Sequence, residues 1–195
     1  MGGKSRASAV HVALLRGINL GGVNRLPMKE LAAMFGDAGC SAVEIYIQSG
    51  NVVFGAPAAL AARVPALIAA AIASRFGHRV PVMTRTAAEL AAVAAANPFL
   101  RAGADPASLH VVFLAAAPKP AQIAALDPDR SPPDRFAVKG REVYLHCPNG
   151  FGRSKLHNDY FESRLGSIST VRNWRTVLKL VEMSGGGESR TAARR

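Results

Sequence analysis

The sequence predicts an α+β protein built from two tandem ferredoxin-like (βαββαβ, α/β-plait) subdomains and a C-terminal helix. Strand and helix patterns alternate along the 195 residues in the order βαββαβ, and this order then occurs a second time. Each half also contains two strand patterns joined by a short glycine-bearing turn, which is typical of a β-hairpin. Hydrophobic residues make up 49% of the chain and charged residues 19%, so the sequence can bury a sizeable core.

The first half contains four strand patterns and two helix patterns. Pro27 suits the first position of a helix, apolar side chains follow at helical spacing, and Gly39 ends that helix. A longer alanine-rich helix follows the hairpin, with Pro65 as a kink or a restart. The strands are expected at residues 11–16, 43–48, 51–54 and 80–85, and the longer helix at 58–76.

The second half follows a connecting helix and repeats the same order. Thr86, with Glu89 three residues later, forms a capping box at the start of the connecting helix. Ser154 and Asn173 are expected to cap the last two helices. The strands are expected at residues 109–115, 135–139, 142–147 and 167–171, and the helices at 118–126, 155–165 and from 174 onward.

These patterns divide the chain into five parts. Glycine, serine and charge at the two ends favour flexible segments, because such compositions cannot bury enough apolar surface to fold. The parts are a flexible leader at 1–8, an N-terminal subdomain at 9–86, a connecting helix and loop at 87–107, a C-terminal subdomain at 108–183 and a disordered tail at 184–195.

The composition indicates the kind of partner and the compartment. With 24 Lys and Arg against 13 Asp and Glu, the net charge of +11 favours nucleic acid or an anionic metabolite, although an arginine-rich composition alone also produces it. Cys40 and Cys147 lie far apart in the sequence and could form one bridge, but they make no disulfide framework and no C-x-x-C motif, so we expect a reducing cytoplasm. No signal peptide and no stretch of ~20 apolar residues is present, so we expect no membrane partner.

The first polar block, at residues 13–28, places glycines and hydrogen-bond donors between a strand and a helix. Glycines let the backbone approach a ligand, and N–H groups at a helix start favour an anion; a simple tight turn is the alternative. The spacing matches no nucleotide-binding fingerprint. At the hairpin tip that follows, Asn51 is expected near the opposite end of the central strand pair from Arg16. The candidate ligand-binding residues here are Arg16, Asn19, Asn24, Arg25, Gln48, Ser49 and Asn51.

The second polar block, at residues 149–166, contains two glycines followed by a Gly-Arg-Ser-Lys (GRSK) segment, residues 152–155, at an expected helix start. Backbone N–H groups and two cations suit phosphate or carboxylate, whereas the alternative is a glycine turn with solvated cations. The next helix start again combines arginine and asparagine side chains. Trp174 continues an apolar helical stripe there, so a core position is favoured over base stacking. The candidate residues here are Arg153, Ser154, Lys155, Asn158, Arg172, Asn173 and Arg175.

The sequence contains no signature that identifies a reaction. No histidine pair has the spacing of metal ligands, so no metal site is expected, and no G-x-S-x-G is present. His157 and Asp159 are compatible with acid–base chemistry or with a solvated helix face. The catalytic residues and any cofactor stay unknown, as does the oligomeric state.

Four blocks together resemble the bacterial domain-of-unknown-function family numbered 1697: LLRGINLGGVNRLPM, YIQSGNVVF, GRSKLHNDYFESRLG and TVRNWRTVLKL. The resemblance spans nearly all of residues 10–183 in the same order. It implies a tandem pair of ferredoxin-like subdomains in a small bacterial protein, and it implies no reaction, substrate or cofactor. The positions that match the family pattern are Arg16, Gly17, Asn19, Gly21, Gly22, Asn24, Gln48, Ser49, Gly50, Asn51, Gly152, Arg153, Ser154, Lys155, Asn158, Asn173, Trp174 and Arg175.

Three functions are compatible with these observations. The favoured one is binding of an anionic, phosphorylated or carboxylated small molecule between the two subdomains, as a binding protein or as an enzyme of unknown reaction. The second is a nucleic-acid-binding module that uses the basic surface. For base stacking, the strand at 51–54 offers only Phe54 and the strand at 109–115 only Phe113. The third is a structural or protein-interaction role.

Overall fold

The computed structural model describes residues 8–185 of the chain. The leader expected at residues 1–8 and the tail expected at 184–195 lie outside these described residues, apart from Ser8 and residues 184–185. The described part therefore contains the strand and helix patterns from which the fold class was predicted.

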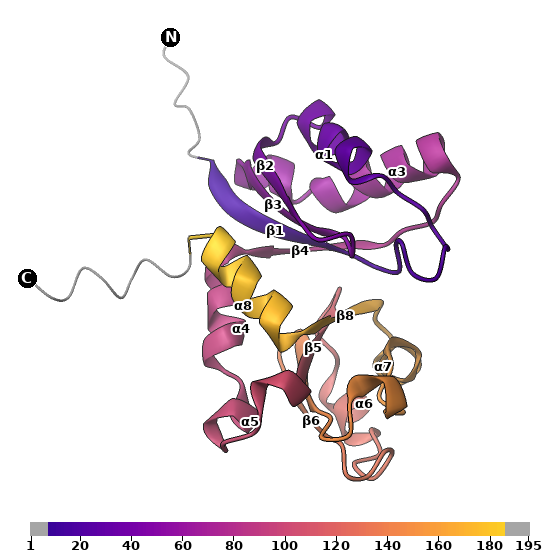
Figure 1. The fold of residues 1–195 in the computed structure, drawn as a ribbon, viewed down its shortest axis with the longest axis vertical. Coiled ribbons are helices and arrows are strands. Elements are labelled where there is room, and N and C mark those ends of the chain that lie inside the picture. Colours follow the sequence, from indigo (N-terminus) through magenta and orange to yellow (C-terminus); the bar gives the residue numbers. More distant parts are fainter. Residues whose placement is uncertain (1–7, 186–195) are drawn as a thin grey trace, which may run out of the picture. The chain divides into compact units, whose positions relative to one another are not determined.

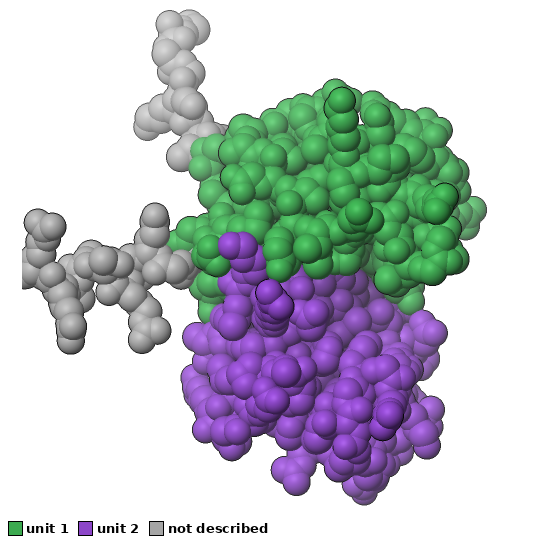
Figure 2. All heavy atoms as spheres, viewed as in Figure 1, with its two compact units in different colours: residues 1–91, 180–195 green, residues 92–179 purple. Residues whose placement is uncertain are grey.

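The chain divides into two compact units, residues 1–91 with 180–195 and residues 92–179 (Figure 2). Each unit contains one four-stranded antiparallel sheet together with helices. The architecture is therefore of mixed α and β type, in agreement with the predicted α+β class.

The sheet of the first unit has the strand order β2-β3-β1-β4. Two helices, α1 and α3, lie on the same face of this sheet (Figure 1). Leu31 and Phe35 of α1 pack in one core with Ile68 of α3 and Phe54 of the sheet, because helical spacing brings their apolar side chains to one stripe. The elements are β1 (Ala9–Leu15), α1 (Met28–Asp37), β2 (Ser41–Tyr46), β3 (Asn51–Ala56), α2 (Ala58–Ala61), α3 (Val64–Phe76) and β4 (Val82–Thr86).

The sheet of the second unit has the corresponding order β6-β7-β5-β8. Its core joins Phe161 and Leu165 of α7 to Val112, Val143 and Leu145 of the sheet. A 3-10 turn precedes β5 at Pro106–Ser108, and another precedes α7 at Phe151–Arg153. The elements are β5 (Leu109–Leu114), α6 (Pro120–Ala124), β6 (Arg135–Lys139), β7 (Glu142–His146), α7 (Asn158–Leu165) and β8 (Ser169–Asn173).

Three further helices are α4 (Ala87–Ala95), α5 (Pro98–Arg101) and α8 (Trp174–Met183). The predicted capping box at α4 is confirmed: Thr86 N donates to Glu89 Oε2 at 2.8 Å, and Glu89 N donates to Thr86 Oγ1 at 3.1 Å. The predicted cap at α8 is also confirmed, since Asn173 Oδ1 accepts from Thr176 N at 2.8 Å. The sequence analysis missed α5, which Asn97 caps through its side chain.

The structure decides between the two alternatives at Pro65 and corrects the predicted start of the helix after Ser154. Of the two alternatives at Pro65, the restart is found: α2 ends at Ala61 and α3 begins at Val64. The prediction that Ser154 caps a helix starting at residue 155 is wrong, because α7 begins only at Asn158. Ser154 Oγ instead accepts from Leu156 N at 3.0 Å, so the serine shapes the extended segment before the helix.

The β2–β3 hairpin meets the end of β1. Leu14 is paired with Asn51, and Leu15 N donates to Gly50 O at 2.8 Å. Arg16 and Asn51 thus lie at the same end of the central strand pair, which corrects the expectation of opposite ends: antiparallel pairing brings the end of β1 to the start of β3. Gly50 has φ +77°, and a Cβ there would lie 2.6 Å from Leu15 Cβ, so the position requires glycine.

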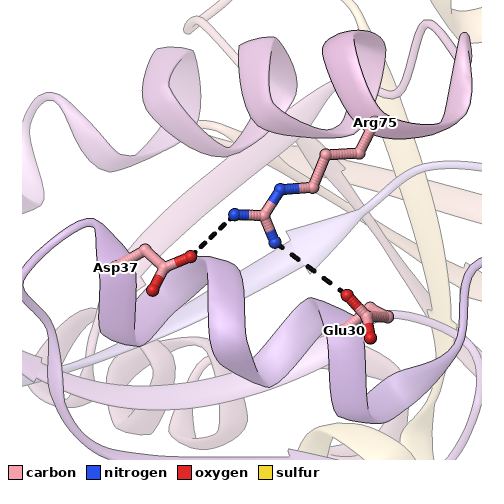
Figure 3. Close-up of polar contacts among 3 residues, drawn as sticks. All are labelled: Glu30, Asp37 and Arg75. Carbon is pink, nitrogen blue, oxygen red and sulfur yellow. Dashed lines mark hydrogen bonds and ion pairs between the residues drawn. The ribbon is translucent and has the colours of Figure 1, made fainter.

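On the solvent side, α1 and α3 are connected by ion pairs from one arginine (Figure 3). Arg75 Nη2 lies 2.7 Å from Asp37 Oδ2, and Arg75 Nη1 lies 3.9 Å from Glu30 Oε2. These side chains are largely exposed, so the pairs add little stability. They do direct the carboxylate of Glu30 toward α3.

The last strand of each unit carries a buried arginine at an equivalent position. Arg85 of β4 is paired with Val12, and Arg172 of β8 is paired with Val111. Each guanidinium donates to the preceding carbonyl, Arg85 Nη1 to Thr84 O at 2.9 Å and Arg172 Nη1 to Val171 O at 2.8 Å. In both units the residue after the arginine caps the following helix. The two strand-to-helix junctions therefore share one local design.

Candidate functional site

The loop between β1 and α1 is held together by asparagine side chains. Asn19 Nδ2 donates to Leu26 O and to Gln48 O, both at 3.0 Å, and Asn19 Oδ1 accepts from Leu26 N at 2.8 Å. Asn24 Nδ2 donates to Gly17 O at 3.0 Å. Both asparagines have positive φ, 54° and 49°, a conformation in which asparagine is enriched. These candidate residues therefore satisfy the backbone of their own loop.

The hairpin tip is organised in the same way. Asn51 is fully buried, and its Nδ2 donates to Tyr46 O at 3.1 Å and to Ser49 Oγ at 2.9 Å. Gln48 is exposed, and its carbonyl accepts the bond from Asn19. The structure thus brings the first block and the hairpin tip together at one end of the first sheet, with Arg16 half-buried and Arg25 exposed.

The GRSK segment of the second unit combines buried and exposed side chains. Ser154 is buried, whereas Arg153 and Lys155 are exposed. Lys155 N donates to Ser131 Oγ at 3.0 Å, and Ser131 Oγ donates to Asp134 Oδ2 at 2.7 Å. These bonds fasten the backbone of the segment to the loop before β6 while leaving the Lys155 ammonium in solvent.

The candidates around β8 have different environments. Arg172 is buried, and its Nη1 donates to Thr170 Oγ1 at 2.7 Å; burial lowers the pKa of Arg172 to about 10. Trp174 is 1% exposed, as expected of a core anchor. Arg175 is exposed. Asn158 Oδ1 accepts from Ser169 Oγ at 3.0 Å, which joins the start of α7 to the start of β8.

A pocket of about 410 Å³ lies in the second unit, between α7 with its preceding segment and the loop after α6. One predicted ligand-binding residue, Lys155, lines it, together with His157 and Asp159, for which the sequence left acid–base chemistry or a solvated helix face open. Three of the lining residues are cationic and two are carboxylates. The lining residues are Asp127, Arg130, Lys155, His157, Asp159, Tyr160, Ser163 and Arg164.

Tyr160 organises one wall of this pocket. Its hydroxyl oxygen accepts from Asp127 N at 2.8 Å, and the Arg130 guanidinium carbon lies 5.4 Å from the centre of its ring, a cation–π arrangement. Asp127 Oδ1 accepts from Asp129 N at 2.9 Å, so this carboxylate also stabilises the turn that carries Arg130. The loop after α6 is thereby held against α7.

A row of aromatic rings connects the core of this unit to the pocket. His110 stacks on Phe151 with ring centres 4.7 Å apart, and Phe151 meets the pocket residue His157 edge-on at 5.4 Å. Burial lowers the pKa of His110, while a hydrogen bond with the Ser108 backbone acts in the opposite direction. Burial therefore favours a neutral His110 imidazole.

The two cysteines are free and buried. Burial, and then the charge of Asp134, raise the pKa of Cys147 to about 11, although a hydrogen bond with Ser154 opposes this. Burial also raises the pKa of Cys40. Both thiols are thus protonated at neutral pH and unsuited to nucleophilic attack.

Within residues 8–185, no three His, Cys, Asp or Glu side chains are grouped so that they could hold a metal ion. Over the same range, no helix combines the length and hydropathy that a transmembrane segment requires.

The sequence singled out Lys155, His157 and Asp159 but did not connect them to the other pocket residues. Asp159 and Ser163 lie four residues apart, so the polar face of α7 that they share could have been recognised from the sequence, whereas Lys155 lies before this helix. Asp127 and Arg130 lie 29 to 37 residues before the α7 residues that line the pocket, and no periodicity indicates that they meet this helix.

Comparison with known proteins places the chain in a family without adding a reaction. A family model described as "Protein of unknown function (DUF1697)" matches residues 9–144. Among solved structures, the chain is similar to the conserved bacterial protein SP0830 from Streptococcus pneumoniae, with 20% sequence identity and a TM-score of 0.69. That match covers 91% of this chain and 99% of the other, and it shows likeness of fold. Among curated proteins, none matches.

Proposed function

We propose that this chain, which belongs to the DUF1697 family, binds an anionic small molecule in the pocket of its second unit. One observation carries the proposal: the side chains of Arg130, Lys155 and Arg164 line a single pocket. Guanidinium and ammonium groups form charge-assisted hydrogen bonds with phosphate and carboxylate oxygens, the strongest hydrogen bonds that side chains make.

The size and composition of the pocket narrow the ligand class. A volume of about 410 Å³ lies within the range of roughly 300–1,000 Å³ typical of small-molecule sites. Asp127 and Asp159 accompany the three cations, so a purely polyanionic ligand is less suitable than one that also carries hydroxyl or amino groups. We therefore propose a phosphorylated or carboxylated metabolite with such donors, and we assign it no reaction.

The nucleic-acid alternative receives little support from the aromatic residues of the central strands. Phe54 and Phe113 are fully buried, so neither ring can stack on a base. Sequence-tolerant binding of single strands relies on such stacking. The basic composition alone therefore carries no second proposal.

We also propose that both units are ferredoxin-like plaits and that the protein is cytoplasmic. The strand orders β2-β3-β1-β4 and β6-β7-β5-β8 support the first proposal, because in each unit the first and third strands are central neighbours. Two free, buried cysteines support the second, since a reducing compartment keeps thiols unpaired.

Calorimetric titration tests the binding proposal with inorganic pyrophosphate, 3-phosphoglycerate and citrate as probes. We expect at least one probe to bind and to raise the melting temperature. Replacing Arg130 or Lys155 by Gln should weaken that binding about tenfold, the effect of one lost charge-assisted hydrogen bond. Arg153→Gln is the matched control, since Arg153 is exposed, lies in the same segment and does not line the pocket. Absence of binding by every probe, or an equal loss with the control, would contradict the proposal.

A further inference from the structure

The most exposed large apolar side chains of the described residues gather at one end of the first unit. Leu20 and Val23 are each 63% exposed and Ile47 is 51% exposed, more than any other large apolar side chain in residues 8–185. Leu20 and Val23 flank a Gly-Gly turn, and Ile47 lies at the hairpin tip. The bond from Asn19 Nδ2 to Gln48 O, 3.0 Å long, holds these two turns side by side.

The backbone that presents these side chains is ordered and strained. Val23 N donates to Leu20 O at 2.9 Å, and Asn19 N donates to Asn24 O at 3.2 Å, in addition to the asparagine side-chain bonds. Ile47 has φ +50°, a left-handed conformation that is a genuine outlier for a β-branched residue. Strain of this kind persists where the surrounding structure enforces it, and it concentrates at binding and switch sites.

The segments that meet at this end of the first unit also carry cationic side chains. We define the loop end as residues 16–29, 47–50 and 77–81, which contain Arg16, Arg25, Lys29 and Arg79 and no Asp or Glu. The third segment belongs to the same end, because Arg16 N donates to Pro81 O at 3.0 Å and His78 Nε2 lies 3.2 Å from Arg25 O. Arg25, Lys29 and Arg79 are exposed. The nearest acid along the chain, Glu30, is directed toward Arg75 (Figure 3).

We propose that the loop end docks a short acidic segment of a partner protein. Aliphatic side chains of that segment would cover Leu20, Val23 and Ile47, and its carboxylates would meet the cations of the loop end. Charge complementarity selects this occupant: a second copy would bring together two cationic surfaces of a chain whose net charge is +11. Nucleic acid fits less well, since the loop end contains no Phe, Tyr or Trp on which bases could stack.

The size of the surface indicates a short segment and not a large interface. Three side chains cover much less than the roughly 800 Å² per partner of a standard stable complex. Such a surface suits transient recognition of a peptide, in which a few apolar anchors give affinity and a charged rim gives rate and specificity. This inference is independent of the pocket in the second unit and stands or falls separately from it.

Selection from a phage-displayed library of random 12-residue peptides on the immobilised full chain tests the proposal. We expect enrichment of peptides that combine Asp or Glu with Leu, Ile or Val, and the consensus peptide is then synthesised and titrated by fluorescence polarisation. The double variant L20S/V23S should weaken its binding at least about tenfold. R25Q/R79Q should weaken it and should also reduce its dependence on salt.

Matched controls separate docking from general surface effects. I168S removes a side chain that is 48% exposed in the second unit, and R63Q removes an exposed cation outside the loop end. Both should bind the peptide as the unchanged chain does. Melting temperatures of all variants establish that each one is folded before its binding is compared.

Four outcomes would overturn the proposal. The first is that the selection enriches no acidic–aliphatic peptides. The second is that L20S/V23S and the unchanged chain bind the peptide equally. The third is that phosphatidylglycerol vesicles or an RNA oligonucleotide bind in a way that depends on the loop end, while no peptide binds. The fourth is a dimer in analytical ultracentrifugation that L20S/V23S abolishes, which would identify a second copy as the occupant.

Discussion

The two units share the junction between their last strand and the following helix but differ in what their loops present. Arg85 and Arg172 occupy equivalent registers, and Thr86 and Asn173 cap the helices that follow. In the first unit the polar loop residues bind backbone, and apolar side chains face solvent. In the second unit the polar residues line a pocket. Equivalent positions thus maintain the fold, whereas the loops differ in the chemistry they offer.

The two hairpin turns give the largest expected contrast. Gly50 has φ +77° and no room for a Cβ beside Leu15, whereas Gly140 has φ +61° and only the far end of Glu142, 3.8 Å away. We expect Gly50→Ala to cost about 3 kcal/mol of unfolding free energy and Gly140→Ala about 1 kcal/mol. Urea denaturation measures both. Similar losses would mean that the close approach to Leu15 does not constrain the turn.

The buried arginines test whether the shared junctions are energetically equivalent. Replacing Arg85 or Arg172 by Met keeps an unbranched aliphatic stem but removes the guanidinium with its hydrogen bonds, and it leaves the Thr84 or Val171 carbonyl without this donor. We expect each variant to lose about 2 kcal/mol. Denaturant titration of the two single variants checks this. A large loss in one unit and none in the other would break the proposed equivalence.

The buried thiol of the second unit predicts a dependence of stability on alkaline pH. The pKa of Cys147 in the folded chain is about 11, above its ordinary value, so folding favours the protonated thiol. The contribution of the protonated Cys147 thiol to the free energy of unfolding is complete below about pH 8.5 and declines as the pH rises toward 11. Between pH 8 and pH 10 the unchanged chain should lose about 1.8 kcal/mol more than Cys147→Ala, because a thiol with a pKa of about 8.5 in the unfolded chain ionises over this range.

Denaturation at several pH values up to 10 measures this difference. Burial and then the charge of Glu142 raise the pKa of Tyr144 to about 12, but both proteins contain this tyrosine, so its effect cancels in the difference between them. Parallel pH profiles of the two proteins would show that the thiol does not titrate in the folded chain as proposed.

The helix caps provide the smallest expected effect. Thr86→Ala and Asn173→Ala each remove one side-chain acceptor from a helix start, and each should cost about 1 kcal/mol. Thr86→Ser and Asn173→Asp, which retain an acceptor, should recover most of the loss. Thermal denaturation of the four variants makes the comparison, and unequal losses would show that only one junction depends on its cap.

Local chemistry accounts for what the sequence predicted correctly. Apolar, β-rich runs and hairpin turns indicated the strands, Thr86 with Glu89 and Asn173 identified two helix starts, and Pro65 indicated a kink or a restart. Each of these signals acts over a few residues, so the rest of the chain need not be known. The same reasoning missed the start of α7, because Ser154 lies in a segment fixed by Ser131, more than 20 residues away in the sequence.

The candidate site depended on contacts that no local pattern contains. Arg172 lies near the end of a strand, where charged side chains are commonly exposed. In the sheet it is paired with the buried Val111 of the central strand β5, and Arg172 is itself buried. Asn19 and Asn51 carry donors that would suit a ligand, yet both donate to backbone carbonyls. Asn19 donates to Leu26 O, seven residues away, and to Gln48 O on the hairpin tip, and Asn51 donates to Tyr46 O, five residues away. The pocket required Asp127 and Arg130 to meet α7, which only the tertiary fold provides.

The hydrogen bond from Lys155 N to Ser131 Oγ affects the free energy with which the second unit would bind a ligand. Because Ser131 is itself bonded to Asp134, the segment that contains Lys155 and the segment that contains Arg130 are held near one another in the absence of a ligand. Association then demands little ordering of the chain, and preorganisation of this kind raises affinity without adding a single contact.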